Sequence, residues 1–356
     1  ESGADLGVMI SASHNPMPDN GIKFFAKGGD KLADSLEAQI EARLGEPWSR
    51  PTGLDVGRIF SDESASTRYV DYLLSTISTD LAGLKVVVDC ANGASSSVAP
   101  LAYKNAGALV TAISASPTGW NINENCGSTH LENLIAEVKK TGADLGVAHD
   151  GDADRCLLVA SNGDVIDGDY ILNILARSYF DDGKLKKNTV VGTVMSNLGF
   201  IKSMESVGIN VEKTAVGDRY VLEKMLENDY VLGGEQSGHI IMRQFSNSGD
   251  GLLTALQIMQ VMAKTKQSLL DLSSNMSKYP QVLINVKDVA KEKLASSAKI
   301  KQAVIDAEKD LAGVGRVLLR ASGTESLVRV MVEANDLQLA NKVADSLAQL
   351  VRLELK

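Results

Sequence analysis

The sequence predicts an α/β protein made of several domains. Apolar runs of four to eight residues, the usual length of buried strands, alternate with segments whose apolar residues recur at helical spacing. This alternation is typical of strands and helices packed around largely parallel sheets. The 356 residues suffice for two or three domains of roughly 100 to 200 residues each. With 44% hydrophobic and 23% charged residues, a buried core is expected.

The net charge and the cysteine content indicate which kinds of partner and which cellular compartment to expect. The 36 basic and 45 acidic residues give a net charge of -9, which disfavours nucleic acid and anionic membranes as partners. No apolar run reaches the roughly 18 residues of a membrane span and no signal peptide is recognisable, so we expect a cytoplasmic protein. Cys90, Cys126 and Cys156 are odd in number and far apart, which indicates reduced thiols. Small molecules are the expected partners, and a homodimer is left open.

The first of four successive blocks, residues 1–66, opens with an apolar run from Leu6 to Ile10 that predicts a buried strand. Such a run so close to residue 1 leads us to expect further chain before it. A Gly- and Pro-rich segment at 45–57 predicts a surface loop. Between them we expect a helix, whose apolar face recurs at i, i+4 spacing and comprises Leu32, Leu36, Ile40 and Leu44.

The second block, residues 67–165, begins with a predicted helix over 67–77. It continues with LKVVVDCANG, a strand that ends in a glycine turn and leads into a helix. Two further strands flank the acidic loop DGDADR, and Asn162 and Gly163 predict the turn after the second of them.

The last two blocks cover residues 166–275 and 276–356. The third should hold strands near Val190 and Val231 and a long helix from Asp250 to Leu270, and the fourth is expected to be smaller. Its predicted strands are 282–286, 317–320 and 327–332, with helices between and after them. The apolar stripe of the long helix indicates core packing and consists of Leu252, Leu253, Leu256, Met259 and Met262.

The motif SASHNP, residues 11–16, lies where the first strand ends. Ligands bind at the ends of strands in α/β sheets. The hydroxyl of Ser13 could carry a transferred group if His14 or Lys23 removed its proton. The alternative is a plain turn, which Ser, Asn and Pro all favour.

Carboxylates at i, i+2 and i+4 characterise DGDADR, where Asp150, Asp152 and Asp154 fall on one side of an extended or looped backbone. Three hard oxygen donors gathered there favour Mg²⁺, which would relieve their mutual repulsion. An EF-hand would place Gly and Glu where this chain has Arg155 and Ser161, so that reading fails. A solvated acidic turn remains the alternative.

Two glycine-containing loops have the side chains that sugar phosphates need. GGEQSGH, residues 233–239, offers Glu235, Ser237 and His239 as a mixed polar set suited to a polyol, or it is a Gly-rich bulge. RASGTE, residues 320–325, could cradle a phosphate or form a plain hairpin turn. The groups that would hold that phosphate are Arg320, Ser322, Gly323, Thr324 and Arg329.

Two short patterns are read as helix starts. Gly217, Asp218 and Arg219 fit either a helix N-terminus, with Asp218 near its dipole, or a ligand contact, and the helix start is favoured. Thr129 to Glu132 fits a capping box, which makes His130 structural.

A serine acceptor, an acidic metal loop, a polyol loop and a phosphate cradle are together what phosphoryl transfer on a sugar phosphate requires. At this point the chain resembles the α-D-phosphohexomutases. SASHNP with DNGIKF, then DGDADR, GEQSGH and RASGTE with LVRVMVE appear in that family's order and approximate spacing over essentially the whole chain. GGEQSGH and VGDRYV resemble the branch that acts on glucosamine phosphates.

The resemblance implies a four-domain architecture, with three α/β domains containing mixed sheets and a smaller α+β C-terminal domain. It implies interconversion of glucosamine 6-phosphate and glucosamine 1-phosphate, with glucosamine 1,6-bisphosphate as activator and intermediate, on the route to UDP-N-acetylglucosamine and cell-wall precursors. Ser13 would be the phosphoserine and would complete an Mg²⁺ site with the three aspartates. Lys23 and His239 would transfer protons, and Arg155 would steady the transferred phosphoryl group.

Further residues would hold the sugar phosphate. By the same resemblance, Glu235 and Ser237 would bind sugar hydroxyls. The C-terminal loop would bind the phosphate that does not react. Because a bisphosphate must stay captive while it reorients and the product must then leave, we expect the fourth domain to close as a lid about a hinge at 278–281. The family commonly has prolines where this chain has Ala321 and Ser326, which should loosen the loop slightly. It also has further strands and an Arg-bearing loop before the serine.

Three alternatives stay open. A relative acting on mannose or glucose phosphates would share every motif. A metal-dependent phosphatase of the haloacid-dehalogenase kind would need a DxDx[TV] run, which the chain lacks at Asp150 and Asp152. A sugar-phosphate-binding protein without catalytic activity is the third.

Overall fold

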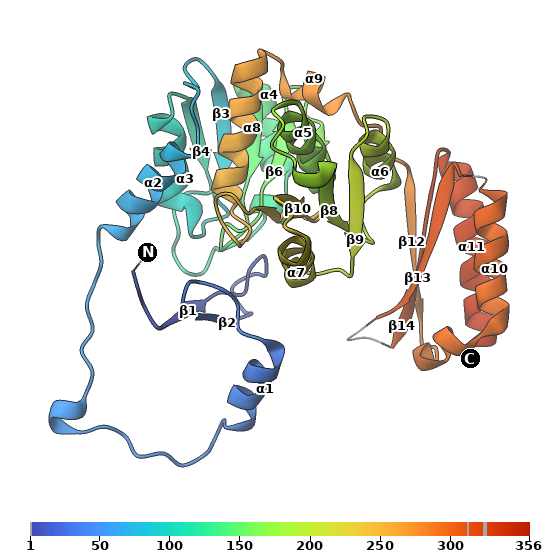
Figure 1. Ribbon diagram of the computed structural model, residues 1–356, viewed down its shortest axis with the longest axis horizontal. Coiled ribbons are helices and arrows are strands. Elements are labelled where there is room, and N and C mark those ends of the chain that lie inside the picture. The colour runs from blue at the N-terminus through green and yellow to red at the C-terminus, as the bar shows by residue number, and fades with distance from the viewer. Residues whose placement is uncertain (1, 312, 323–325) are drawn as a thin grey trace. The chain divides into compact units, whose positions relative to one another are not determined.

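The computed structural model describes residues 2–311, 313–322 and 326–356, and its chain forms two compact units (Figure 1). The first unit runs up to Val194 and includes Ile209–Ser274, whereas the second comprises Met195–Gly208 and Asn275–Lys356. Within the described residues, the first unit contains three sheets and the second contains one. Among the described residues, no helix is both long and apolar enough to cross a bilayer.

The first sheet is a hairpin of β1 (Leu6–Ile10) and β2 (Ile22–Ala26), paired antiparallel with Ile10 opposite Ile22. The predicted strand is confirmed, but its predicted burial is wrong. Leu6, Val8 and Ile10 are 54%, 58% and 78% exposed. A strand is buried only where another layer covers its face, and among the described residues none covers this face of the hairpin.

The helix predicted next is α1 (Asp34–Ala42), but its predicted apolar face is wrong. Leu32 is buried and precedes the helix, whereas Leu36 and Leu44 are 42% and 77% exposed. The surface loop predicted at 45–57 is confirmed, with only the short η1 (Gly53–Asp55) inside it.

The second sheet has the strand order β4-β3-β5-β6-β7. β3 pairs parallel with β4 and β5, and β6 pairs antiparallel with β5 and β7, so the sheet is mixed. The predicted strands, helices and Asn162–Gly163 turn are confirmed. Its elements are α2 (Ala65–Ser75), β3 (Lys85–Asp89), α3 (Ser95–Asn105), β4 (Leu109–Ile113), η2 (Gly127–Thr129), α4 (Glu132–Thr141), β5 (Leu145–Ala148), β6 (Leu157–Ala160) and β7 (Val165–Ile166).

The capping box predicted at Thr129 is wrong. α4 begins at Glu132 with Leu131 as its N-cap, and no side chain caps it. Thr129 belongs instead to η2, so its hydroxyl is out of register with the first turn of α4. His130 is exposed beside it, as a residue with no part in the chemistry would be.

The third sheet has the order β11-β10-β8-β9, with β8 parallel to β9 and β10, and β11 antiparallel. The predicted long helix is interrupted, because Lys266 takes a left-handed conformation that ends α8 and Ser268 starts a new helix with a capping box. The stripe of α8 is buried as predicted. The elements are α5 (Gly168–Asp181), η3 (Lys186–Asn188), β8 (Thr189–Thr193), β9 (Asn210–Thr214), α7 (Asp218–Asn228), β10 (Leu232–Gly234), β11 (Ile240–Met242), α8 (Gly251–Thr265) and α9 (Leu269–Ser273).

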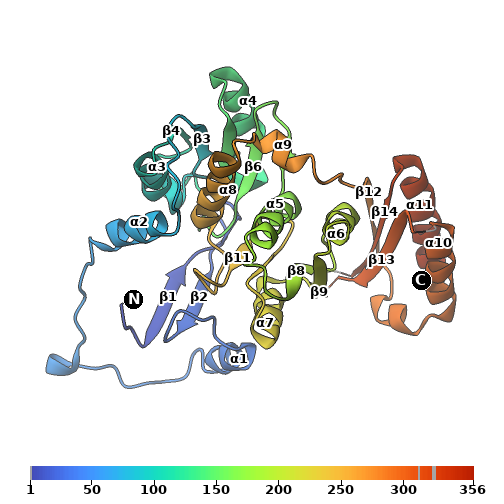
Figure 2. The ribbon, with the colours of Figure 1, turned by 45° about the horizontal axis from the view of Figure 1, so that its top comes forward.

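The second unit contains an antiparallel sheet of order β12-β14-β13, with α10 and α11 on one face (Figure 2). Val328, Val330 and Val332 alternate along β14 toward the buried core under these helices. The three predicted strands are confirmed. The elements are α6 (Leu198–Glu205), β12 (Gln281–Lys287), η4 (Lys291–Ser296), α10 (Ala298–Asp310), β13 (Gly315–Ala321), β14 (Leu327–Ala334) and α11 (Leu337–Glu354).

Candidate active site

The loop that follows β1 holds Ser13 in an unusual conformation. Ser13 has φ of 55°, in the left-handed region that side chains rarely adopt. Asn123, from the second sheet's domain, donates hydrogen bonds of 2.9 Å to the carbonyl oxygens of both Ser13 and Asn15. A Cβ on Gly151 would lie 2.6 Å from the Ser13 carbonyl oxygen, so only glycine permits this approach. The serine loop is therefore held directly against the acidic loop.

The acidic loop connects the antiparallel strands β5 and β6, and its three aspartates converge. One oxygen each from Asp150, Asp152 and Asp154 lie within 4.8 Å of one another. The Ser13 hydroxyl donates to Asp150 Oδ2 at 3.3 Å, across 137 residues of sequence. Ser11 Oγ donates to Asp152 Oδ2 at 3.1 Å. The structure thus brings together the serine and the acidic trio that the sequence analysis singled out.

The donor set of this trio fits a hard divalent cation. Oδ1 of Asp152 and Oδ1 of Asp154 are buried and have no hydrogen-bond partner among the described residues. Buried carboxylate oxygens normally have partners, and oxygen-only sets are what Mg²⁺ prefers. Burial, with the nearby charges of Asp154 and Asp152, raises the pKa of Asp150 to about 7. A cation among these oxygens would remove that repulsion.

Two cationic side chains border the trio. Lys23 Nζ lies 2.5 Å from Asp152 Oδ2 and 3.9 Å from Asp154 Oδ2. Burial alone would lower the pKa of Lys23, but its hydrogen bond to Asp152 and the negative charges of the three aspartates together offset that effect, and the pKa is raised. Arg155 Nε lies 4.0 Å from Asp150 Oδ2 and 3.9 Å from Asp154 Oδ1. Both cations are thus in place to meet a phosphoryl group at the aspartates.

His239 lies between two carboxylates. Its Nδ1 is 3.5 Å from Asp154 Oδ2 and its Nε2 is 3.5 Å from Asp218 Oδ2. The backbone N–H of Gly249 donates to Nε2 at 3.1 Å, which requires a lone pair there and places the ring proton on Nδ1. Although burial opposes ionisation of Asp154, its hydrogen bond to His239 and nearby positive charges lower its pKa to about 2.

His14 is the nearest ring to the serine hydroxyl. Its Nδ1 lies 3.3 Å from Ser13 Oγ. Burial and the positive charge of Arg155 lower the pKa of His14, which favours the neutral ring that can accept a proton.

The predicted polyol loop joins β10 to β11 and is tied to the start of α7. Glu235 Oε1 accepts the backbone N–H of Gly217, the N-cap of α7, at 2.9 Å. Asp218 is the first residue of the helix, as the favoured reading predicted, and Arg219 pairs with Glu223 at 2.8 Å. Ser237 is exposed at the tip of the loop. Glu235 therefore couples the two motifs, GGEQSGH and VGDRYV.

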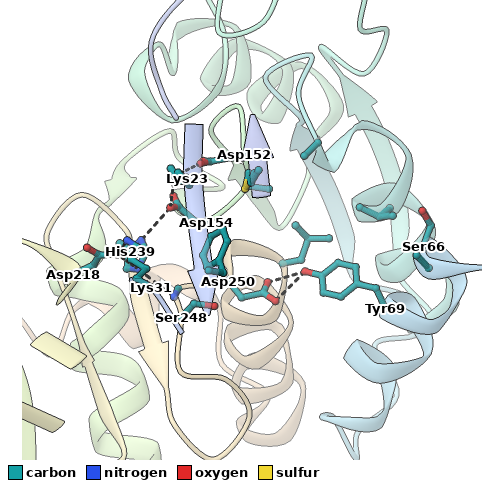
Figure 3. A pocket seen from close by; sticks show the side chains of 18 residues that line it. Lys23, Lys31, Ser66, Tyr69, Asp152, Asp154, Asp218, His239, Ser248 and Asp250 are labelled. Atoms are coloured by element: carbon teal, nitrogen blue, oxygen red, sulfur yellow. Dashed lines mark hydrogen bonds and ion pairs between the residues drawn. The ribbon is translucent and has the colours of Figure 1, made fainter. Parts of the chain in front are cut away.

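A cavity of about 460 Å³ opens beside these groups (Figure 3). Lys31, which the sequence analysis missed, lines it and forms an ion pair with Asp218. Tyr69, also missed, donates its hydroxyl to Asp250 Oδ2 at 2.9 Å on the opposite wall. No motif surrounds Lys31 or Tyr69 in the sequence, so no local signal pointed to them. The charged lining is Lys23, Lys31, Asp152, Asp154, Asp218, His239 and Asp250.

The predicted phosphate loop belongs to the second unit, between β13 and β14. Arg320 and Arg329 are directly opposite each other in the strand register. Like charges placed opposite one another disfavour the sheet unless an anion neutralises them. Ser322 is buried and its carbonyl oxygen accepts a 2.7 Å hydrogen bond from Lys291. Gly323 and Thr324 lie outside the described residues.

Comparison with known proteins matches one family along the chain. The models describe domains I, II and III of phosphoglucomutase/phosphomannomutase, each alpha/beta/alpha, at residues 1–48, 67–163 and 167–279, and its C-terminal domain at 283–350. The chain belongs to this family. The four-domain α/β architecture expected from the sequence is thereby confirmed.

Similar family members include two curated bacterial proteins. A phosphoglucosamine mutase of Streptomyces griseus is 56% identical over 358 residues, covering 99% of this chain and 79% of the relative. One of Paenarthrobacter aurescens is 55% identical over 352 residues, covering 99% and 78%.

Solved structures support the fold. A phosphoglucomutase/phosphomannomutase family protein of Burkholderia thailandensis superimposes with a TM-score of 0.82 at 22% identity, covering 99% of this chain and 78% of that one. Aspergillus fumigatus N-acetylphosphoglucosamine mutase, in complex with GlcNAc-6P and magnesium, gives 0.76 at 18% identity, covering 100% and 90%. At such identities the likeness concerns the fold alone.

Proposed function

We propose that this phosphohexomutase interconverts glucosamine 6-phosphate and glucosamine 1-phosphate. The observation that carries the proposal is the hydrogen bond from Ser13 Oγ to Asp150, at the edge of three converging carboxylates. The choice of glucosamine is supported by the relatives at 55–56% identity, which are phosphoglucosamine mutases. The proposal includes a cytoplasmic location, in keeping with three unpaired cysteines.

The proposed reaction needs two phosphoryl transfers. Phosphorylated Ser13 gives its phosphoryl group to the free 1- or 6-hydroxyl of the substrate, whose proton passes to a base. The resulting glucosamine 1,6-bisphosphate turns over, and the phosphoryl group at its other end returns to Ser13. In the first transfer the serine oxygen takes up a proton as its bond to phosphorus breaks. In the second it gives up that proton as it gains the phosphoryl group, and the sugar oxygen that loses its phosphoryl group takes up a proton, so no net phosphate is consumed.

Proton movement is assigned to Lys23 and His239, which both lie beside the trio. Lys23 Nζ and His239 Nδ1 lie 3.9 Å and 3.5 Å from Asp154 Oδ2, within reach of a group bound at the aspartates. His14, 3.3 Å from the serine hydroxyl, is the proposed partner of the leaving serine oxygen. Arg155 would stabilise charge on the transferred group.

Asp150, Asp152, Asp154 and the phosphate of Ser13 are the proposed ligands of Mg²⁺. When bound, this ion would neutralise charge on the phosphoryl group. The assignment is supported by the buried oxygens of Asp152 and Asp154 that accept no hydrogen bond among the described residues.

Binding of the remainder of the substrate is assigned to loops of both units. Glu235 and Ser237 would hold sugar hydroxyls, and the Gly217–Arg219 turn would border them. The phosphate that does not react would be bound by the loop of the second unit. The proposed phosphate ligands are Arg320, Ser322, Gly323, Thr324 and Arg329.

The proposed domain boundaries are those expected from the sequence. The four domains would comprise residues 1–66, 67–165, 166–275 and 276–356.

Mass and turnover test the proposal together. Active protein should carry about 80 Da of added phosphate at residue 13, and Ser13→Ala should lose both this mass and mutase activity. Ser75→Ala, at an exposed position of α2, is the matched control and should retain both.

The substrate is tested by turnover of glucosamine, mannose and glucose phosphates with a trace of each bisphosphate. Equal or faster turnover of mannose or glucose phosphate would overturn the choice of sugar. Release of inorganic phosphate as the main product would indicate a phosphatase, and binding without turnover would indicate a sugar-phosphate-binding protein.

A further inference from the structure

Next to the acidic loop is a buried histidine for which the reaction above has no role. His149 immediately precedes Asp150 and is completely buried. Its Nδ1 lies 3.0 Å from the carbonyl oxygen of Arg155, and its Nε2 lies 2.8 Å from the hydroxyl of Tyr103. No carboxylate is among these partners.

These two contacts determine where the ring proton is. The ring is completely buried and neither contact is a carboxylate, and because a buried charge without a counter-ion is costly, the ring is neutral and carries one N–H. A carbonyl oxygen can only accept, so the N–H must be at Nδ1 and point to Arg155. Nε2 is then an acceptor, and Tyr103 donates its hydroxyl proton to it. The Arg155 carbonyl thereby fixes the tautomer of His149, and the hydrogen bond from Tyr103 holds the ring in its orientation.

The carbonyl that His149 holds belongs to the residue that closes the acidic loop. The backbone N–H of Arg155 donates to Asp150 Oδ1 at 3.1 Å, which leaves Asp150 Oδ2 facing the Ser13 hydroxyl at 3.3 Å. Arg155 is therefore held through its carbonyl by His149 and through its N–H by Asp150. One line of hydrogen bonds connects the helix α3, which carries Tyr103, to the serine.

The start of α8 packs tightly on the same point. A Cβ on Gly251 would lie 2.2 Å from the Arg155 carbonyl oxygen and 2.7 Å from His149 Nδ1. The Gly251 N–H also donates to the Ala153 carbonyl oxygen at 2.9 Å. Because no space is left around the Arg155 carbonyl, we expect that replacing the His149 side chain displaces Arg155.

We propose that His149, oriented by Tyr103, is a positioning residue that holds Asp150 and Arg155 in place for cation binding and phosphoryl transfer. This inference rests on the proposed function, since it assigns the acidic trio to a divalent cation. His149 touches neither substrate nor cation and acts only through Arg155. Removing an orienting hydrogen bond behind a metal ligand typically costs about 10- to 100-fold in affinity or activity.

The test compares His149→Phe with His149→Asn in the full chain. Phenylalanine fills the space without a donor, whereas the amide of asparagine can donate from nearly the position of Nδ1. Binding of Mn²⁺ alone is measured by electron paramagnetic resonance and calorimetry. We expect affinity to fall about 10- to 100-fold in His149→Phe and to remain close to that of the unaltered protein in His149→Asn. KM for the sugar phosphate should change little while kcat falls.

A second variant reports on the orientation of the ring. Tyr103→Phe removes the donor to Nε2, so the ring should be held only by the Arg155 carbonyl, its Nδ1–H should exchange faster with solvent, and Mn²⁺ affinity should fall. With four histidines in the chain, ¹H–¹⁵N correlation spectra of the rings can follow this N–H directly. Tyr179→Phe is the matched control, because it also loses one buried hydrogen bond, from Gln244 at 2.7 Å. It should alter neither the exchange of the His149 N–H nor Mn²⁺ affinity.

The outcomes separate this inference from the function on which it rests. If the unaltered protein binds Mn²⁺ tightly and His149→Phe binds it equally tightly, the inference is overturned and the proposed function is not. No Mn²⁺ binding by the unaltered protein would overturn the metal site and the inference with it. If His149→Phe does not fold, Tyr103→Phe decides: unchanged exchange of the His149 Nδ1–H with unchanged Mn²⁺ affinity overturns the inference, and a joint change supports it.

Discussion

At the scale of single residues, burial controls the chemistry of the three cysteines. Cys90, Cys126 and Cys156 are unpaired and at most 2% exposed. Burial raises the pKa of all three thiols, that of Cys90 to about 12. The thiolate is the reactive form, so a buried thiol with a raised pKa is doubly protected.

We therefore predict that the native protein reacts with no equivalent of a thiol-specific chromogenic reagent at pH 8. Three equivalents should react after denaturation in guanidinium chloride. Rapid native labelling of any one cysteine, located by peptide mass, would contradict this prediction.

Lys23 provides a test of proton transfer by a single residue. Replacing it by methionine keeps most of the side-chain length and removes the charge beside Asp152. If Lys23 transfers a proton, kcat should fall by about 10²- to 10⁴-fold. Mn²⁺ affinity should not fall, because a competing cation has been removed from the trio.

Lys27→Met is the control for this experiment, since Lys27 directly follows β2, the strand that carries Lys23, and pairs with Asp5 at an exposed position. It should leave kcat unchanged. A Lys23→Met variant with nearly full kcat would exclude Lys23 from proton transfer.

At the scale of elements, α8 depends on a buried acidic N-cap. Asp250 accepts the backbone N–H of Leu253 at 2.9 Å and the hydroxyl of Tyr69. Burial nevertheless dominates and raises the pKa of Asp250 above its usual value. Burial of the ionised carboxylate of Asp250 thus destabilises the folded protein, and this destabilisation grows as a larger fraction of the group is ionised.

The pH dependence of this cost has a definite sign. When the pKa of a group is higher in the folded than in the unfolded protein, the group contributes to stability. This contribution is fully present below the unfolded-state pKa and is lost as pH rises through the folded-state pKa. Asp250→Asn keeps a good N-cap and removes the charge. We therefore expect the free energy of unfolding of Asp250→Asn, minus that of the unaltered protein, to increase as pH rises from about 4 to 7. Urea denaturation measures both values.

Asp271 offers a control with the opposite sign. It is the exposed N3 residue of the α9 capping box, and its hydrogen bonds with Ser268 lower its pKa. Its contribution is present above the unfolded pKa and is lost as pH falls. Asp271→Asn should lose stability relative to the unaltered protein as pH rises over the same range. The same trend in both variants would contradict the assignment at Asp250.

At the scale of the whole molecule, the two units are assigned different tasks. The first unit holds the serine, the acidic trio and the proton-transfer groups, whereas the second holds the paired arginines of β13 and β14. If Arg320 binds the phosphate that does not react, Arg320→Met should raise KM for the sugar phosphate by about 10- to 100-fold.

Arg352→Met, on the exposed side of α11, is the control and should leave KM unchanged. Phosphorylation of Ser13 should persist in both variants, since the serine and its partners lie in the first unit. An Arg320→Met variant with normal KM would contradict the phosphate assignment.

Sequence patterns predicted most of the strands and helices, and the failures have identifiable causes. Strands β2 (IKFFA), β4 (LVTAI), β9 (NVEKT) and β11 (IIM) were not predicted, because each spans only three to five residues, which is too short for a clear periodicity. β1 was predicted as buried because its residues are apolar, but burial depends on the layer packed above a strand and not on the strand itself. α8 was predicted too long because its apolar spacing continues past Lys266, where the backbone turns left-handed.

The sequence by itself determined the chemistry available, because each motif carries its own functional groups: a hydroxyl at Ser13, carboxylates at Asp150 and its neighbours, and guanidinium groups near the C-terminus. Only the tertiary structure decided which groups meet. Lys31, Asn123 and the pair of Tyr103 with His149 have no local signature, since each acts through contact with a segment distant in sequence. Side-chain chemistry is a property of the residue, whereas proximity and burial are properties of the fold.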